Sequence, residues 1–396
     1  MPDTLLLADV RPLGGAPADV LIEGGRIAAV GSGLEAPDRL DGGGAILLPG
    51  LVESHTHMDK TQLGRGWQPN RGGPKLLDFI ANDRRMKREL GLDPAMQSAR
   101  QVVQTVACGT THIRTHVDVD TEVGLRGIEG VLETRRRYAD AVDIQIVAFP
   151  QSGLLVRPGT AELLDEAMRL GADLVGGLDP SAIDRDPKGH LDAVFALADR
   201  HGRGIDIHLH EPGELGAFAV ELIVERTAAL GMRGKVTVSH AFCLAMPDEA
   251  RVAALIEGLA GQDIAVMTTG PASRPAPPIR KLVAAGLRVG SGNDGIRDAW
   301  SPYGNGDMLE RAMLLGLTNN CRSDPDLELA LSICTSGGAA MLGLDRYGLE
   351  PGCDADLVLI DAETLAEAVV DHRPRRLVLK RGRVVAEAGK ALLEAP

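Results

Sequence analysis

Eight short β-rich runs alternate with longer helical stretches through the middle of this 396-residue chain. The stretches with helical patterns include residues 125–138, 161–170, 191–201 and 247–259. Repeated strand–helix alternation is typical of a parallel sheet covered by helices, and eight units over roughly 240 residues suit a (β/α)8 barrel. We therefore predict an α/β fold with a (β/α)8 TIM barrel, and a doubly wound open sheet is the alternative. The predicted strands are residues 45–55, 111–117, 143–149, 172–178, 204–208, 235–240, 264–268 and 287–292.

The two ends of the chain carry a different pattern, in which β-branched runs flank turn residues. Residues 20–30, 355–360 and 377–386 have the pattern of hairpins. Neither end can bury a core alone, so we expect both ends to meet in one small β-sandwich, with the barrel inserted between them. The predicted domains are residues 1–45 with 346–396 for the β-sandwich and residues 46–345 for the barrel.

Charge and cysteine content exclude several classes of protein. The formal net charge of -13 argues against nucleic acid or an anionic membrane as a partner. No run approaches the ~18 apolar residues of a transmembrane helix, and the start lacks the basic segment of a signal peptide. Five scattered cysteines without a Cys-x-x-Cys pair predict neither a disulfide framework nor a thiolate zinc site. We therefore expect a cytoplasmic location.

Polar residues gather where the predicted strands end. His55 and His57 lie two positions apart at the end of the first strand, so both imidazoles point to one side and could converge on one cation. The catalytic groups of a (β/α)8 barrel lie at the carboxyl ends of its strands, and six of the ten histidines fall there. Some of these histidines could instead be buried in the core, with their ring nitrogens hydrogen-bonded to other residues. The strand-end residues are His55, His57, His116, Asp118, Gln151, His208, His210, Glu211, His240 and Asp294.

These motifs resemble those of the amidohydrolase superfamily, in its cytosine-deaminase-like branch. The segments of this chain that resemble the superfamily are PGLVESHTHMD at 49–59, RTHVD at 114–118 and DGIRDAW at 294–300, with further similar segments at 143–151, 206–208 and 238–240. The resemblance covers nearly the whole chain, so no single motif carries it. It implies a barrel enzyme of the hydrolase class.

The resemblance also implies roles for individual residues. His55, His57, His208 and Asp294 would bind one divalent metal ion, and a site of three imidazoles and one carboxylate tolerates zinc or iron. His240 would hold or deprotonate the attacking hydroxide beside Asp294. Glu211 would carry a proton from water to a ring nitrogen and then to the leaving amine. Gln151 would bind an amide-like edge of the substrate.

Two features narrow the reaction. The predicted strand at 172–178 has no lysine, whereas binuclear amidohydrolases bridge two metals with a carboxylated lysine there. Gly295 follows Asp294, whereas cytosine deaminases have a second Asp that touches the pyrimidine, so the ring itself stays open among pyrimidine, triazine and pterin-like types. We predict a deaminase that removes ammonia or a small amine from such a heterocycle. A cyclic amide hydrolase and a non-catalytic scaffold are the alternatives.

Three residues near the predicted site have no assigned role. His116 and Asp118 either shape the barrel mouth or support the metal ligands, and Lys60 either pairs with a carboxylate or points to solvent. The predicted partners are a small heterocyclic substrate and further copies of the chain in a homo-oligomer.

Overall fold

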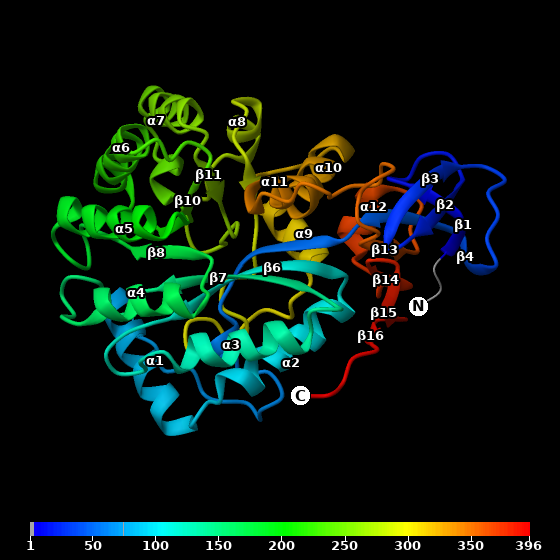
Figure 1. Cartoon of the computed structure of the whole chain (residues 1–396). Coiled ribbons are helices and arrows are strands. Elements are labelled where there is room, and N and C mark those ends of the chain that lie inside the picture. The colour runs from blue at the N-terminus through cyan, green and yellow to red at the C-terminus, as the bar shows by residue number, and fades with distance from the viewer. Residues whose placement is uncertain (1–3, 74) are drawn as a thin grey trace.

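Two eight-stranded sheets make up the fold in this computed structural model, which describes residues 4–73 and 75–396 (Figure 1). One sheet is wholly parallel, and helices surround it. The other is mixed and contains strands from both ends of the chain. Residues 1–3, which belong to the first predicted domain segment, lie outside the described residues. The predicted α/β class and the (β/α)8 barrel are confirmed.

The parallel sheet forms a nearly closed barrel, with strand order β12-β11-β10-β9-β8-β7-β6-β5. Ser54 N donates to Ser291 O at 3.0 Å and Asp294 N to His55 O at 2.9 Å, which brings the first and last strands together. The end of β5 therefore lies beside the loop that follows β12. The barrel strands are β5 (Leu51–Thr56), β6 (Thr110–Asp118), β7 (Asp143–Phe149), β8 (Leu174–Leu178), β9 (Gly204–His208), β10 (Val236–Ser239), β11 (Ala265–Met267) and β12 (Val289–Gly290).

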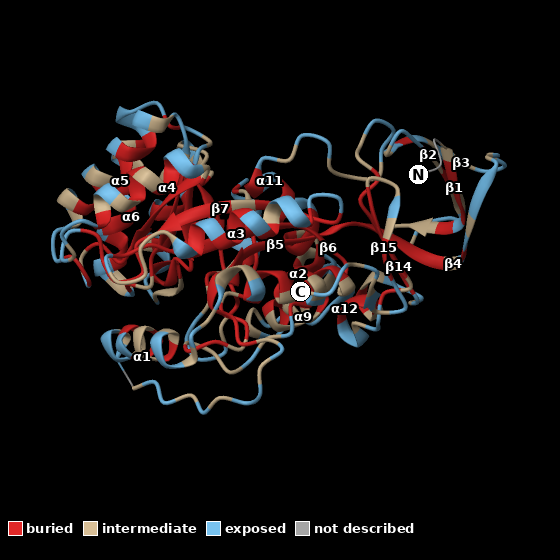
Figure 2. Ribbon diagram, turned by 60° about the horizontal axis from the view of Figure 1, so that its bottom comes forward, coloured by how far each residue is buried: buried red, intermediate tan, exposed pale blue. Residues whose placement is uncertain are grey.

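Helices cover the outside of the barrel, and their outer faces are exposed while the strands beneath are buried (Figure 2). Several begin at a capping aspartate, as at Asp93, Asp186 and Asp248, whose carboxylates accept backbone N–H groups of the first turn. The four helical stretches named from the sequence are confirmed as α3, α4, α5 and α7. The α-helices around and after the barrel are α1 (Leu76–Leu90), α2 (Pro94–Ala107), α3 (Arg126–Arg137), α4 (Thr160–Leu170), α5 (Pro187–His201), α6 (Gly213–Ala229), α7 (Glu249–Gly261), α8 (Ile279–Ala284), α9 (Met308–Thr318), α10 (Asp324–Ser332), α11 (Gly338–Leu342) and α12 (Leu365–Asp371).

Shorter helical turns complete the barrel. They are the 3-10 helices η1 (Met58–Lys60) and η2 (Phe242–Ala245) and the π-helical turn η3 (Ile333–Gly337). No helix within the described ranges is both long enough and apolar enough to cross a membrane.

The mixed sheet joins the two ends of the chain in the order β16-β15-β14-β13-β4-β1-β2-β3. Strand β4 is the link, because it pairs in parallel with β1 and antiparallel with β13. The predicted meeting of the two ends is therefore confirmed, and the domain bounds remain a prediction. The strands are β1 (Thr4–Pro12), β2 (Ala18–Glu23), β3 (Arg26–Gly31), β4 (Asp38–Pro49), β13 (Leu357–Ile360), β14 (Leu377–Lys380), β15 (Arg383–Glu387) and β16 (Lys390–Ala391).

One predicted strand is wrong in extent. The run 45–55 was expected to be a single barrel strand, but it divides at Gly50 into the end of β4 and the start of β5. A Cβ at Gly50 would overlap the side chain of Thr111, so only glycine allows this close approach. Both halves are apolar and buried, which is why the hydrophobic pattern alone runs through the break.

A buried ion cluster joins the mixed sheet to the base of the barrel. Lys380 Nζ lies 2.7 Å from a carboxylate oxygen of both Asp143 and Asp356 and 3.3 Å from His112 Nε2. Burial and the adjacent Lys380 ammonium lower the pKa of His112 to about 3, so its ring is neutral. The Lys380 ammonium group lies between the carboxylates of Asp143 and Asp356 and balances their negative charge.

Candidate active site

His55, His57 and Asp294 meet where β5 ends against the loop that follows β12. Asp294 Oδ1 lies 3.2 Å from His57 Nε2 and 3.7 Å from His55 Nε2. Both imidazoles are buried, whereas 38% of the Asp294 side chain is exposed, so the cluster reaches solvent at this carboxylate. The side chains of His55 and His57 thus converge, as their spacing predicted.

His208 and His240 complete the cluster from the neighbouring strands β9 and β10. His208 Nε2 lies 3.4 Å from His57 Nε2, and the ring stacks on Phe149 with the centroids 4.0 Å apart. His240 follows β10 in a left-handed conformation with φ of 70°, and its backbone N–H donates to Met267 O. Nitrogen atoms of His55, His208 and His240 all lie within 4.8 Å of one another. The five residues predicted from the sequence therefore form two overlapping groups that share His55, one with His57 and Asp294 and one with His208 and His240.

Three separations among the proposed ligand atoms suit a small divalent metal ion. Four ligands about 2.1 Å from a metal ion at the corners of a tetrahedron are about 3.4 Å apart. The observed separations between ligand atoms are 3.2, 3.4 and 3.7 Å. Nε2 atoms of His55 and His240 are buried and have no hydrogen-bond partner in the described chain. Such unpaired nitrogens are costly unless an absent group binds them.

The charge states of these residues also suit a metal site. Burial, reinforced by neighbouring imidazoles, lowers the pKa of His208 well below its usual range and does the same for His55 and His240. Their rings are therefore neutral and keep the lone pairs that a metal ion needs. Burial opposes ionisation of Asp294, but the hydrogen bond from His57 and the interactions with His240 and His55 together outweigh burial and hold the pKa of Asp294 well below its usual range.

Beneath the cluster, Ser239 connects His55 to a buried ion pair. Ser239 Oγ lies 3.1 Å from His55 Nδ1 and donates to Asp206 Oδ1 at 2.6 Å, and Arg114 Nη1 donates to Asp206 Oδ2 at 3.0 Å. Because Ser239 Oγ donates its only proton to Asp206, it must accept a hydrogen bond from the N–H at His55 Nδ1. The other ring nitrogen, Nε2, then carries no proton and keeps its lone pair. Sequence reasoning missed this support, although polar Asp206 and Ser239 in buried strands were a signal.

Glu211, three residues after His208, has one carboxylate oxygen bound and one free. Oε1 accepts backbone N–H groups of Ser181 at 2.7 Å and Ala182 at 2.6 Å. Oε2 is buried and has no partner among the residues described. Burial raises the pKa of Glu211, although the Ala182 N–H opposes that rise. A carboxyl group held by one oxygen, with a raised pKa, can take up and release a proton at the other.

Gln151 is held by a buried lysine. Lys60 Nζ donates to Gln151 Oε1 at 2.6 Å and to both oxygens of Asp118, at 3.0 and 3.1 Å. Burial disfavours the Lys60 ammonium, but the carboxylates of Asp118, Asp83 and Asp59 together outweigh burial and raise the pKa of Lys60. Lys60 therefore stays charged and occupies the acceptor end of Gln151. Of the two possibilities for Lys60, pairing with a carboxylate is the one observed, and Asp118 is its partner.

Two further histidines border the cluster. His116 is fully buried with its ring centroid 4.0 Å from that of His55, and neither ring nitrogen finds a hydrogen-bond partner within the described ranges. His210 points elsewhere, because its Nδ1 pairs with Asp179 Oδ2 at 2.7 Å. Asp179, which sequence reasoning also missed, accepts the His210 backbone N–H at 2.6 Å as well. His208 rather than His210 thus faces the cluster.

Several known proteins are similar to this chain over most of its length. The model of the family described as "Amidohydrolase family" matches residues 39–386. N-isopropylammelide isopropyl amidohydrolase of Pseudomonas sp. (strain ADP) is 34% identical over 382 residues, which are 93% of each chain. The structure of N-isopropylammelide isopropylaminohydrolase from Burkholderia multivorans is 51% identical with a TM-score of 0.96, over 98% of this chain and 100% of that one. That of 5-methylcytosine deaminase from Klebsiella pneumoniae, liganded with 5-fluorocytosine, is 28% identical with a TM-score of 0.85, over 96% and 97%.

Proposed function

The chain belongs to the amidohydrolase family, and on that basis we propose that it removes ammonia or a small amine from an amino-substituted nitrogen heterocycle by hydrolysis. It is a hydrolase acting on carbon–nitrogen bonds. The observation that carries the proposal is the pair of largely buried groups that share His55, one with His57 and Asp294 and the other with His208 and His240. Glu211, three residues after His208, adds a buried carboxylate oxygen without a partner in the described chain. Relatives named for a triazine, N-isopropylammelide, and for a pyrimidine, 5-methylcytosine, support a substrate among such rings.

We infer that His55, His57, His208 and Asp294 hold one divalent metal ion, zinc or iron. When bound, such an ion lowers the pKa of water enough to provide hydroxide near neutral pH. His240 faces the same space with an Nε2 that has no partner in the described chain, and it is neutral. It therefore accepts a hydrogen bond or a proton from the attacking water, beside Asp294.

Glu211 moves the protons. Its Oε1 is held in place by Ser181 and Ala182, so Oε2 has a defined position. Oε2 takes one proton from water and delivers it to the ring nitrogen next to the attacked carbon, and the second proton follows to the leaving nitrogen. A carbon–oxygen bond forms, the carbon–nitrogen bond breaks, and ammonia or an amine leaves as a neutral base.

Gln151 orients the ring. Because Lys60 binds Gln151 Oε1, the Nε2–H groups of the amide are the groups left without a partner in the described chain, and an acceptor on the substrate would pair with them. A ring carbonyl oxygen or an unprotonated ring nitrogen meets this requirement.

A screen for amine release tests the proposal. Purified protein is incubated with N-isopropylammelide, cytosine and pterin, and ammonia or isopropylamine is measured while mass spectrometry identifies the ring product. We expect amine release with the ring intact from at least one of these compounds. A ring-opened acid would instead indicate cyclic amide hydrolysis. Absence of any reaction from a protein without stoichiometric metal would favour a non-catalytic scaffold.

We also propose that the chain forms a homo-oligomer and works in the cytoplasm. Large apolar side chains such as Trp67 (67% exposed) and Tyr303 (79% exposed) lie at the surface, which supports contact with another copy. The five cysteines are free thiols in the described chain, in keeping with a reducing compartment. Light scattering on the purified protein tests the first point, and it would be contradicted by a monomer at micromolar concentration.

A further inference from the structure

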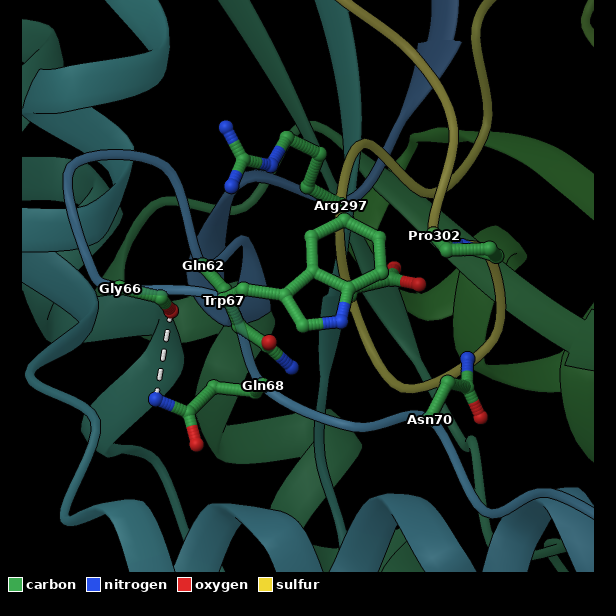
Figure 3. Close-up of a pocket in the computed structure, with 8 residues that line it drawn as sticks. Gln62, Gly66, Trp67, Gln68, Asn70, Arg297 and Pro302 are labelled. Carbon is green, nitrogen blue, oxygen red and sulfur yellow. Dashed lines mark hydrogen bonds between the residues drawn. The ribbon is translucent and has the colours of Figure 1, made fainter.

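A hollow opens at the mouth of the barrel between the segment after β5 and the segment after β12 (Figure 3). Gln62, Trp67 and Asn70 line one side of it, and Arg297 and Asp298 line the other. Asp298 lies four residues beyond Asp294, in the same segment after β12. None of the mechanistic roles assigned so far uses Asp298.

Asp298 is a buried carboxylate with one free oxygen. Its side chain is 3% exposed, and Oδ1 accepts the backbone N–H groups of Trp300 at 2.8 Å and Ser301 at 2.9 Å. Oδ2 is also buried, yet it has no hydrogen-bond partner within residues 4–73 and 75–396. An unpaired buried carboxylate oxygen is costly, so its retention indicates that something outside the chain binds it.

Gly295 shows where this free oxygen lies. A Cβ built on Gly295 would overlap the Asp298 carboxylate, with Oδ2 as its nearest atom. Oδ2 therefore packs against the residue that follows Asp294. Burial raises the pKa of Asp298 to about 6, and Lys60 and His57 are close enough for their charges to oppose that rise. The free oxygen thus lies against the backbone next to Asp294, on a carboxyl group within range of the charges of Lys60 and His57.

Hydrogen bonds hold the segment that carries Asp298. Thr61 Oγ1 donates to Ile296 O at 2.7 Å, and Gln62 N donates to Arg297 O at 2.8 Å. Asn82 Nδ2 donates to Ala299 O at 3.3 Å. The position of Oδ2 is therefore set before any ligand arrives, which is the condition for selective recognition.

We propose that Asp298 is a specificity-determining residue, whose Oδ2 accepts a hydrogen bond from an N–H of the substrate ring. This inference rests on the proposed function. Together with Gln151, whose Nε2–H groups can donate, it defines the class of substrate as a heterocycle that presents a carbonyl oxygen or bare nitrogen to Gln151 and a free N–H to Asp298. Oxo-substituted amino-triazines and amino-pyrimidines meet both requirements, whereas rings that carry an alkyl group at that nitrogen do not.

Asp298 also stabilises the turn at 298–301 through Oδ1. The variant Asp298→Asn separates this structural role from substrate binding. Asparagine keeps an oxygen for the N–H groups of Trp300 and Ser301 and replaces only the free Oδ2 with a donor. Its melting temperature should therefore stay close to that of the parent protein. Asp93→Asn, at the capping aspartate of α2, is the matched control.

Binding is measured by calorimetry in the Glu211→Gln protein, which prevents turnover, with N-isopropylammelide and its ring N-methyl derivatives as probes. With Asp298 present, methylation at one ring nitrogen should weaken binding at least tenfold, because that N–H is lost. In Asp298→Asn the parent compound should bind about tenfold to hundredfold more weakly, and its advantage over that derivative should disappear. Asp93→Asn should retain both.

Two results would overturn the proposal. One is that no N-methyl derivative binds more weakly than the parent compound when Asp298 is present, a comparison that needs no Asp298 variant. The other is that Asp298→Asn still binds the parent compound more tightly than the N-methyl derivative, with affinities within threefold of those measured when Asp298 is present. Gly295→Ala, whose methyl group displaces Oδ2, should repeat the loss if Asp298→Asn does not fold. Failure of the proposed function would appear separately, as absence of amine release from the protein that retains Glu211.

Discussion

Ser239 Oγ accepts a hydrogen bond from His55 Nδ1 at 3.1 Å. Ser239 donates a hydrogen bond to Asp206, whose charge is balanced by Arg114. This chain of contacts determines which nitrogen of His55 is protonated and leaves Nε2 toward Asp294. The orientation of the first proposed metal ligand is therefore set from beneath the barrel mouth, by residues that do not touch the proposed metal.

Removal of this support should weaken metal binding. Ser239→Ala leaves His55 free to adopt the other tautomer and leaves Asp206 short of one donor. We expect the affinity for zinc to fall about tenfold to hundredfold, as is typical when a residue behind a histidine ligand is removed. Competition with a zinc chelator measures it, and Ser98→Ala, at a buried serine of α2, is the control. Equal zinc affinity in the Ser239→Ala and parent proteins would contradict the role of Ser239.

Glu211 should be needed for turnover but not for metal. Glu211→Gln keeps an oxygen for Ser181 and Ala182 but cannot carry a proton, so kcat should fall about a hundredfold to ten-thousandfold. Metal content by mass spectrometry should stay unchanged. Glu214→Gln, on the exposed first turn of α6, should behave like the parent protein. Near-normal kcat in Glu211→Gln would rule out the proposed proton transfer.

Gln151 should act through its amide donor. In Gln151→Glu the new carboxylate can still pair with Lys60, so the fold is retained, but the N–H groups that face the substrate are lost. We expect kcat/KM to fall about tenfold to hundredfold, mostly through KM, with little change in melting temperature. A variant with unchanged KM would show that Gln151 serves only to satisfy Lys60.

The barrel and the positions of the proposed ligands could be predicted because both follow from local pattern. Strand–helix alternation repeats eight times, and the histidines at 55, 57, 208 and 240 each fall where a strand ends. In a barrel those ends meet, so the sequence pattern alone brings together residues far apart in the chain. The observed separations between His57, His208 and Asp294 agree with that inference.

Contacts between side chains that depend on packing could not be predicted. Lys60 has no periodic signal, and its burial against Asp118 and Gln151 follows from how η1 packs on β6 and β7. The free oxygen of Asp298 lies against Gly295 only because the segment after β12 takes a path with left-handed residues at Asp294 and Arg297. Neither feature has a local sequence pattern, since both are set by non-local contacts.

His112 should make stability depend on pH. Its pKa is about 3 in the folded protein and near 6.5 when unfolded, so the unfolded chain binds more protons between these values. Stability is therefore lost as pH falls from 6.5 towards 3. Between pH 6.5 and 5, we expect the free energy of unfolding of His112→Gln to fall by about 1–2 kcal/mol less than that of the parent protein. Urea unfolding at each pH measures this difference, and a His112→Gln protein with the same pH dependence as the parent protein would contradict the role of His112.

The most direct test of the central claim is a metal titration of turnover. Protein stripped with a chelator is titrated with zinc or ferrous ion, and amine release from N-isopropylammelide, or from the best substrate of the screen, is followed at each step. One metal site built from His55, His57, His208 and Asp294 predicts activity that rises linearly and saturates at one equivalent per chain, with no activity in His208→Ala. Full amine release by metal-free protein, or saturation only at two equivalents, would contradict it.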